Sequence, residues 1–348
     1  MAASFALWLG RDVRHSIVSA AISLALIFAA NRASATPSAT SVEQGYDMGE
    51  IESPRWVAFG GAQSALGAST TAVYDNPANL ASSRVYHFEG LVGFSPIANR
   101  QTYGGGIADS STNQLAARPA GTDAANGLAG GIAGTWSTMD SDGINRQWTD
   151  LRLALAYPVL PNLFVGLTGR YLQVNQAVAR GPFGKDLVSD GTPDQGLTSL
   201  FTFNAGVTYR PVKQLSLGVV GKNLTYPNHP VAPTTVEGGV GLDLGVFSAE
   251  VDGLVDFSTY GSPRGRFSAG AEVFLFDRFA IRLGWRADAG QKVHSFCGGL
   301  GWVDKHFSVE ASIRQDVIAD HPNTMLVFGF RYFYDYNTGG QDPAMTAD

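Results

Sequence analysis

Charged side chains recur at even spacing through residues 247–316, and no other feature of this sequence carries as much chemistry. Glu250 and Asp252 share one parity along the chain, and Arg282 and Arg286 share one parity further on. Alternate residues of a β-strand point to opposite faces, so each set should project from one face. Buried charges are stable only when they are paired, and we therefore expect an ion-pair network. Its predicted members are Glu250, Asp252, Asp256, Arg266, Glu272, Arg278, Arg282, Arg286, Glu310 and Arg314.

Two interpretations of this charged face stay open: a salt-bridge network that fills an interior, and a polar path for conduction. The pattern does not favour catalysis. Asp252 and Asp256 could be paired glycosidase carboxylates, but nearby arginines explain them as salt-bridge partners. His306 shares a face with Ser308 and Glu310, which is ordinary within one strand, and no serine lies where acyl chains would arrive. We predict that the protein is not an enzyme.

Composition narrows the choice of partners and cofactors. The formal net charge is −6, only 16% of the residues are charged, and the basic residues are scattered, so no nucleic-acid surface is expected. The single cysteine, Cys297, allows no intramolecular disulfide and has no metal-ligand spacing around it. We therefore expect no metal and no cofactor.

The elements that would position these charges are fourteen segments of alternating apolar and polar residues between residues 84 and 333. Period-2 alternation with no long apolar run is typical of strands that face lipid on one side and a polar interior on the other. The sequence therefore predicts an all-β fold, a closed antiparallel transmembrane β-barrel of about 14 strands. The expected strands are 84–94, 101–108, 127–138, 147–157, 162–176, 197–210, 213–223, 234–244, 246–258, 265–276, 278–288, 292–303, 305–316 and 324–333.

The connections between these strands alternate in length, as the two ends of a bacterial barrel do. With a periplasmic N-terminus, five of the six connections from even to odd strands are short, for example the single residues Gly245, Asp277 and Asp304. The exception is residues 109–126, for which the sequence offers no explanation. This asymmetry predicts short turns on the periplasmic side and longer loops outside.

The N-terminus predicts export. Arg11 and Arg14 precede an apolar run too short to span a membrane, and Ala33-Ser34-Ala35 offers a cleavage site, so residues 1–35 read as a signal peptide. We place the protein in the outer membrane of a Gram-negative-type bacterium, in contact with its lipid. Residues 334–348 would form a polar tail.

Residues 36–83 are too long and too patterned for a plain linker, and we expect them to form a plug in the barrel mouth. Strands one to three and seven place small residues inward, including Gly104, Gly106, Gly131 and Gly218, which leaves room for such a segment. Within it, Asn76-Pro77-Ala78 favours a turn followed by a short helix.

The same segment carries a resemblance to a known family. The residues concerned are the run Arg55-Trp56-Val57-Ala58-Phe59-Gly60-Gly61-Ala62, the triplet Asn76-Pro77-Ala78 directly before the first strand, and Gly221-Lys222-Asn223-Leu224. Together they resemble the FadL/PorV group of outer-membrane proteins. The resemblance implies fourteen strands with an N-terminal plug.

For function, the FadL branch implies passive, plug-gated passage of small hydrophobic or amphipathic molecules. The PorV branch implies a non-enzymatic scaffold that binds a periplasmic or secretion-system protein, and this alternative stays open. This chain departs from the FadL branch in two respects: it is short, and half of its expected interior is heavily charged.

Overall fold

The computed structural model describes residues 53–83, 85–111, 127–139, 146–176, 195–227, 232–260, 262–320 and 322–334. The predicted signal peptide, residues 36–52 of the predicted plug and residues 335–348 of the predicted tail lie outside these ranges. The domain boundaries drawn there stay predictions.

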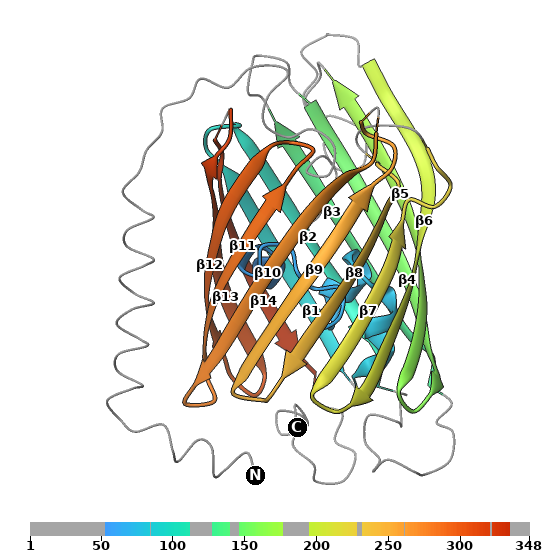
Figure 1. Ribbon diagram of the computed structural model, residues 1–348, viewed down its shortest axis with the longest axis vertical. Coiled ribbons are helices and arrows are strands. Elements are labelled where there is room, and N and C mark those ends of the chain that lie inside the picture. The colour runs from blue at the N-terminus through green and yellow to red at the C-terminus, as the bar shows by residue number, and fades with distance from the viewer. Residues whose placement is uncertain are drawn as a thin grey trace. The chain divides into compact units, whose positions relative to one another are not determined.

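Fourteen antiparallel strands close into a barrel in which each strand pairs with its neighbours in sequence and β1 pairs with β14 (Figure 1). This confirms the predicted fold class. The largest difference from the expected boundaries is the end of β4, expected at residue 157 and found at Leu160. The strands are β1 Tyr86–Ser95, β2 Arg100–Asp109, β3 Ala129–Met139, β4 Arg146–Leu160, β5 Leu163–Gln176, β6 Gln195–Val212, β7 Leu215–Lys222, β8 Thr235–Asp243, β9 Phe247–Asp256, β10 Arg264–Leu275, β11 Phe279–Asp288, β12 Val293–Val303, β13 Phe307–Ile318 and β14 Thr324–Phe333.

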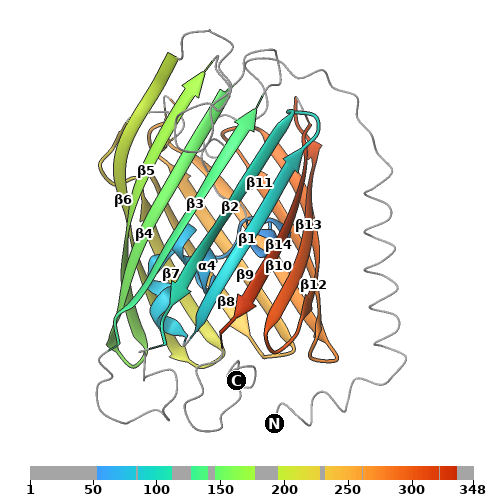
Figure 2. The same ribbon diagram turned by 180° about the vertical axis from the view of Figure 1, so that it is seen from behind.

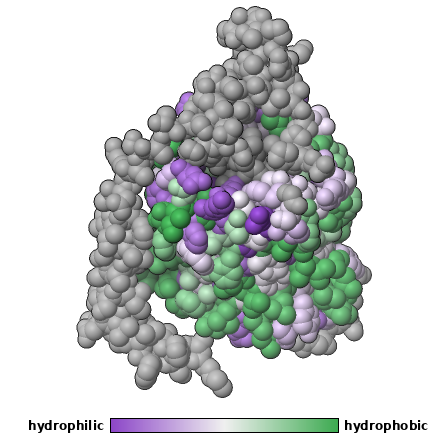
Figure 3. Space-filling model, turned by 45° about the horizontal axis from the view of Figure 1, so that its top comes forward, coloured by the Kyte–Doolittle hydropathy of each residue, from purple (hydrophilic) through white to green (hydrophobic). Residues whose placement is uncertain are grey.

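The pleat of the strands separates an apolar outside from a polar inside. In β4, Leu151, Leu153 and Leu155 are each about half exposed, whereas Asp150 and Arg152, which alternate with them, are buried. Figure 3 shows apolar side chains gathered over the outer wall. A soluble protein has the opposite distribution, so the outer face suits the hydrocarbon of a membrane.

Short turns gather at one end of the barrel, the lower end in Figure 1. They include 161–162 between β4 and β5, 213–214 between β6 and β7, and 244–246 between β8 and β9. Gly245 occupies its turn with a positive φ of 79°, a conformation that suits a residue without a Cβ. β2 ends and β3 begins at this same end, and residues 112–126 of the connection between them are not described.

Inside the barrel lies the inner segment, which we define as residues 53–83; it appears within the ring of strands in both views (Figures 1 and 2). It contains the short helices α3 (Pro54–Ala58) and α4 (Thr70–Tyr74) and the 3-10 helix η2 (Pro77–Ser82). Each proline sits at the first helical position, where its missing N–H is not needed. None of the described helices is long and apolar enough to cross a membrane.

Candidate functional site

Glycines on the barrel wall bring the inner segment into close contact with it. A Cβ added to Gly218 of β7 would overlap the carbonyl oxygen of Ser64, and one added to Gly284 of β11 would overlap that of Ala58. The sequence left room for this segment on strands one to three and seven. Besides Gly218 of β7, Leu91 of β1, Ala108 of β2 and Ala133 of β3 lie in one apolar cluster with Val73 of the inner segment. Gly131 does contact it, at Val73, but Gly104 and Gly106 meet the neighbouring strand instead.

Two carboxylates of β9 hold the middle of the inner segment by its backbone. Asp252 Oδ2 accepts main-chain N–H bonds from Gln63 and Ser64, both at 2.9 Å. Glu250 accepts from the next two residues, with 2.5 Å from Ala65 N to Oε1 and 3.1 Å from Leu66 N to Oε2. Both side chains are buried. Sequence reasoning expected arginine partners for these groups, whereas the main chain of the inner segment supplies these four bonds.

A ladder of alternating charges crosses the part of the wall that begins at β10, the strand next to β9. Arg55 of the inner segment pairs with Glu272 of β10 at 3.2 Å, and Glu272 pairs with Arg282 of β11 at 2.5 Å. Arg282 also reaches Glu310 of β13 at 3.0 Å. These carboxylates and guanidiniums are largely buried. Three residues named for the network, Glu272, Arg282 and Glu310, thus lie in one chain of ion pairs, although the sequence did not indicate which of them pair.

The ladder continues with a pair that parity reasoning missed, Arg331 of β14 and Glu89 of β1 at 3.3 Å. These two residues face each other directly in the β1–β14 register. This pair could have been predicted by aligning the first strand with the last, because a closed fourteen-stranded barrel must bring these two strands together.

The remaining predicted members do not form one continuous network. Arg278 precedes β11 and is exposed in the turn 276–278, so it is not part of the interior wall, contrary to expectation. Asp256, Arg266, Arg286 and Arg314 are buried on the inward parity as expected, with Asp256 Oδ1 accepting the main-chain N–H groups of Ser258 and Thr259. Arg286 Nη2 lies 4.0 Å from Asp288 Oδ2.

Asn76 is more than a turn residue, because its side chain joins the inner segment to the wall. Its Nδ2 donates to the Ser64 carbonyl at 2.7 Å and to Thr208 Oγ1 of β6 at 3.1 Å. Its Oδ1 accepts from Ala78 N at 3.1 Å and so caps η2. Pro77 packs against Gly166 of β5, where no Cβ would fit. The triplet therefore anchors the inner segment at β5 and β6.

Two further buried ionic groups surround α4. Lys222 of β7 bridges Asp75 and Glu237, at 2.5 and 2.6 Å. Burial raises the pKa of the Asp75 carboxyl to about 6, and the Lys222 ammonium opposes this shift. On the other side, Asp150 pairs with Arg152.

Arg170 completes that second group. It pairs with Asp150 at 2.6 Å, and it faces Arg152 directly in the β4–β5 register. Arg152 also donates to the carbonyl of Tyr74 in the inner segment. Parity along β4 and β5 was the signal that could have identified these residues.

These contacts hold a polypeptide segment, and the candidate catalytic side chains are not brought together among the described residues. His306 is exposed in the turn 304–306, whereas Ser308 is buried, so their shared parity brings no pair together. A Ser–His contact does occur elsewhere, with 2.8 Å between Ser69 Oγ and His87 Nδ1. Ser69 is buried and the His87 ring packs against Phe333, so this contact joins the inner segment to β1 and β14. Among the described residues, no group of three or more potential ligands could hold a metal.

Comparison with known proteins yields likeness in structure only. No family model matches the chain, and no curated protein matches its sequence. The CymD monoaromatic hydrocarbon channel aligns with a TM-score of 0.58 at 12% identity, over 84% of this chain and 99% of that one. The Ralstonia pickettii toluene transporter TbuX aligns with a TM-score of 0.56 at 13% identity, over 82% and 99%.

A FadL homologue from Pseudomonas aeruginosa aligns with a TM-score of 0.52 at 11% identity, over 84% of this chain and all of that one (100%). At such low identity the likeness establishes the fold, which is that of FadL-type outer-membrane barrels. The resemblance inferred from the sequence is confirmed to that extent.

Proposed function

We propose that this protein is an outer-membrane channel through which small hydrophobic molecules pass passively, with the inner segment as the gate. Three of its structural neighbours are named for monoaromatic hydrocarbon, toluene or FadL, and all three share its barrel. The apolar outer wall supports a place in the outer membrane of a Gram-negative-type bacterium, in contact with lipid.

The observation that carries this proposal is that the inner segment occupies the interior of the barrel. The inner segment is held by buried, geometrically complementary contacts at β9, at β10 and at β5 and β6. A barrel filled in this way is a poor general pore for water and ions. Passage of a solute therefore requires the segment or its side chains to shift, which is the meaning of gating here.

The bore also has apolar surface for a hydrophobic solute. Trp56 and Val57 of the inner segment pack on Met325 and Val327 of β14. A second apolar cluster, which includes Trp148 and Leu172, lies toward the end with the longer connections. A hydrophobic molecule could move between such surfaces without entering water.

Uptake by whole cells tests this function. Cells that lack their own hydrocarbon channels would be given radiolabelled toluene with and without expression of the full chain. We expect faster toluene uptake on expression, with no increase for labelled glucose as the polar control. Equal toluene uptake in both strains would contradict the proposal and leave the partner-binding scaffold as the better interpretation.

A further inference from the structure

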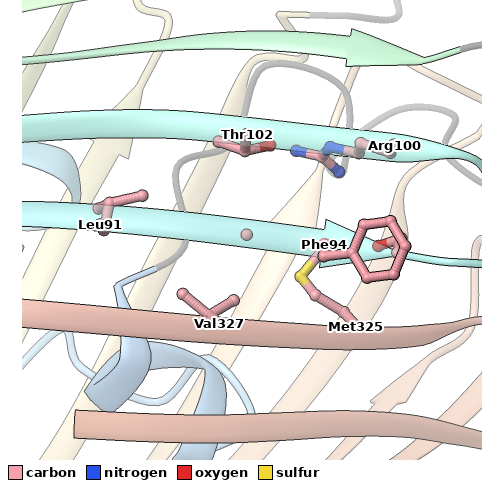
Figure 4. A pocket seen from close by; sticks show the side chains of 8 residues that line it. Leu91, Phe94, Arg100, Thr102, Met325 and Val327 are labelled. Carbon is pink, nitrogen blue, oxygen red and sulfur yellow. The ribbon is translucent and has the colours of Figure 1, made fainter.

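Asp75 brings a carboxylate into the interior of the barrel, directly after helix α4. The residue is only 2% exposed. This interior offers little room for water. The cavity beside β1, β2 and β14, for example, is lined by Leu91, Met325 and Val327 and has room for about one water molecule (Figure 4). A charge buried in such surroundings needs to be neutralised, either by a protein group or by a proton.

One ammonium group serves two carboxylates at this place. Lys222 Nζ lies 2.5 Å from Asp75 Oδ1 and 2.6 Å from Glu237 Oε2. Among the residues that the structure describes, the second oxygens, Asp75 Oδ2 and Glu237 Oε1, are buried without a hydrogen-bond partner. Buried acceptors are usually satisfied. A single proton on Asp75 would remove the excess negative charge of this group and would supply a donor.

The neighbouring strands add negative charge around Asp75. Glu250 and Asp252 of β9 both act on it through space as further carboxylates. The positive groups that act on Asp75 are Lys222 and, more weakly, Arg266 of β10. Carboxylates therefore outnumber cations at this place.

Other charged or titratable groups that face the inner segment have different partners. They are Asp150 with Arg152 and Arg170, Glu89 with Arg331, Arg55 with Glu272, Arg210 with Ser82, and His87 with Ser69. Asp75 differs from the other carboxylates of this set because it shares its ammonium partner with a second carboxylate.

Uptake of a proton by Asp75 is linked to the position of the inner segment. Burial raises the pKa of the Asp75 carboxyl from 3.8 to about 6, and Lys222 opposes the shift. Movement of the segment that admits water would return this pKa toward 3.8. A state in which the pKa of a group is raised is favoured at low pH. The held state is therefore most stable in acid, and its stability falls as the pH rises through about 6.

We propose that Asp75 is a proton-binding site that sets how firmly the inner segment is held, so that acid closes the channel and neutral pH loosens it. The inference rests on the proposed function, in which the inner segment is the gate, and it adds a means of regulation.

Hydrogen exchange of the purified full chain in lipid nanodiscs measures the hold on the segment. The reporters are the main-chain N–H groups of residues 63–66, which donate to carboxylates of β9. Protection factors remove the intrinsic effect of pH on exchange. We expect about tenfold higher protection at pH 5 than at pH 7.5, because the pKa of Asp75 is about 6 in the held state and returns toward 3.8 on release. Protection that is equal at both pH values, or higher at pH 7.5, would overturn the proposal.

Variants assign the effect to Asp75. Asp75→Asn removes the proton-binding group and should abolish most of the change with pH. Asp256→Asn is the matched control and should keep the change, because this buried carboxylate of β9 bonds the main chain just beyond its own strand. Glu237→Gln leaves Lys222 to Asp75 alone and should move the change to lower pH. A wild-type response in Asp75→Asn would refute the assignment. Should that variant fail to fold, an unshifted response in Glu237→Gln refutes it instead.

Toluene uptake by cells at the same two pH values keeps this inference apart from the proposed function. Uptake that depends on expression, together with protection that does not change with pH, would leave the channel standing and overturn proton binding. If protection changes with pH as expected but toluene enters at neither pH, the channel proposal fails and the proton site stands.

Discussion

Asp252 and Ser64 are 188 residues apart in the chain, yet the carboxylate of the first accepts the main-chain N–H of the second at 2.9 Å. The same oxygen, Oδ2, also accepts from Gln63. A strand of the barrel thus holds the inner segment by its backbone, a contact that does not depend on which side chains the segment carries at these positions.

Removing this carboxylate should loosen the inner segment. Asp252→Ala leaves two buried N–H groups without their acceptor, at a cost of about 1–3 kcal/mol each. Limited trypsin digestion at Arg55 measures the loosening, and cleavage should become faster. The matched control is Asp256→Ala, because Asp256 is also buried on β9 but bonds Ser258 and Thr259 instead. Equal cleavage rates in the two variants would show that Asp252 does not hold the segment.

Close packing at the wall predicts opposite outcomes for two glycines. Gly218→Ala places a methyl group against the Ser64 carbonyl and should destabilise the folded protein by about 1–3 kcal/mol, as overpacking does. Gly253→Ala on β9 meets nothing within 4 Å and should change stability little. The measurement is the temperature at which heating before SDS gel electrophoresis removes the band of the folded barrel. A similar loss in both variants would point to the strands themselves and not to the inner segment.

The charge ladder predicts coupling between Arg282 and Glu310. Arg282→Met alone leaves two buried carboxylates short of a partner and should cost about 3–5 kcal/mol, by analogy with other broken buried pairs. Arg282→Met combined with Glu310→Gln should cost less than the sum of the two single changes. Denaturant unfolding of the wild type, the two single variants and the double variant gives the four free energies of the double-mutant cycle. Additive losses would mean that water solvates these groups separately, which favours the polar conduction path.

The difference in turn length predicts which end of the barrel faces outward. Ser262 and Lys305 are exposed in connections at opposite ends of the barrel. With Cys297 buried, a membrane-impermeant maleimide should label Ser262→Cys in intact cells and label Lys305→Cys only after the outer membrane is opened. The reverse pattern would invert the predicted topology.

The sequence was sufficient for the barrel because each strand carries its own periodic signal. Leu151, Leu153 and Leu155 alternate with residues that are polar or small, so β4 could be located from its own residues. Errors came where that signal ends. Arg278 was assigned to β11 by parity, but the strand begins one residue later and the turn exposes it.

Contacts of the inner segment could not be predicted in the same way. They join residues such as Ser64 and Asp252, whose proximity follows from closure of the barrel and not from local spacing. Periodicity indicates that Asp252 faces inward, but not what fills the space in front of it. The role of Lys222 between Asp75 and Glu237 escaped prediction for the same reason.

Locking the inner segment to the wall tests the gate most directly. A Cβ on Gly131 would lie 2.6 Å from Val73 Cγ2, so Val73→Cys with Gly131→Cys places two thiols within reach of a disulfide, in a Cys297→Ser background. The control pair, Ser53→Cys with Thr71→Cys, links the segment only to itself, where the two hydroxyl oxygens are 3.2 Å apart.

Toluene uptake by cells would be measured for both pairs, oxidised and after reduction. If the inner segment is the gate, oxidation should block uptake in the 73–131 pair and reduction should restore it, whereas the 53–71 pair should transport in both states. Full uptake by the oxidised 73–131 pair would show that solutes pass without movement of the inner segment, and would contradict the gate.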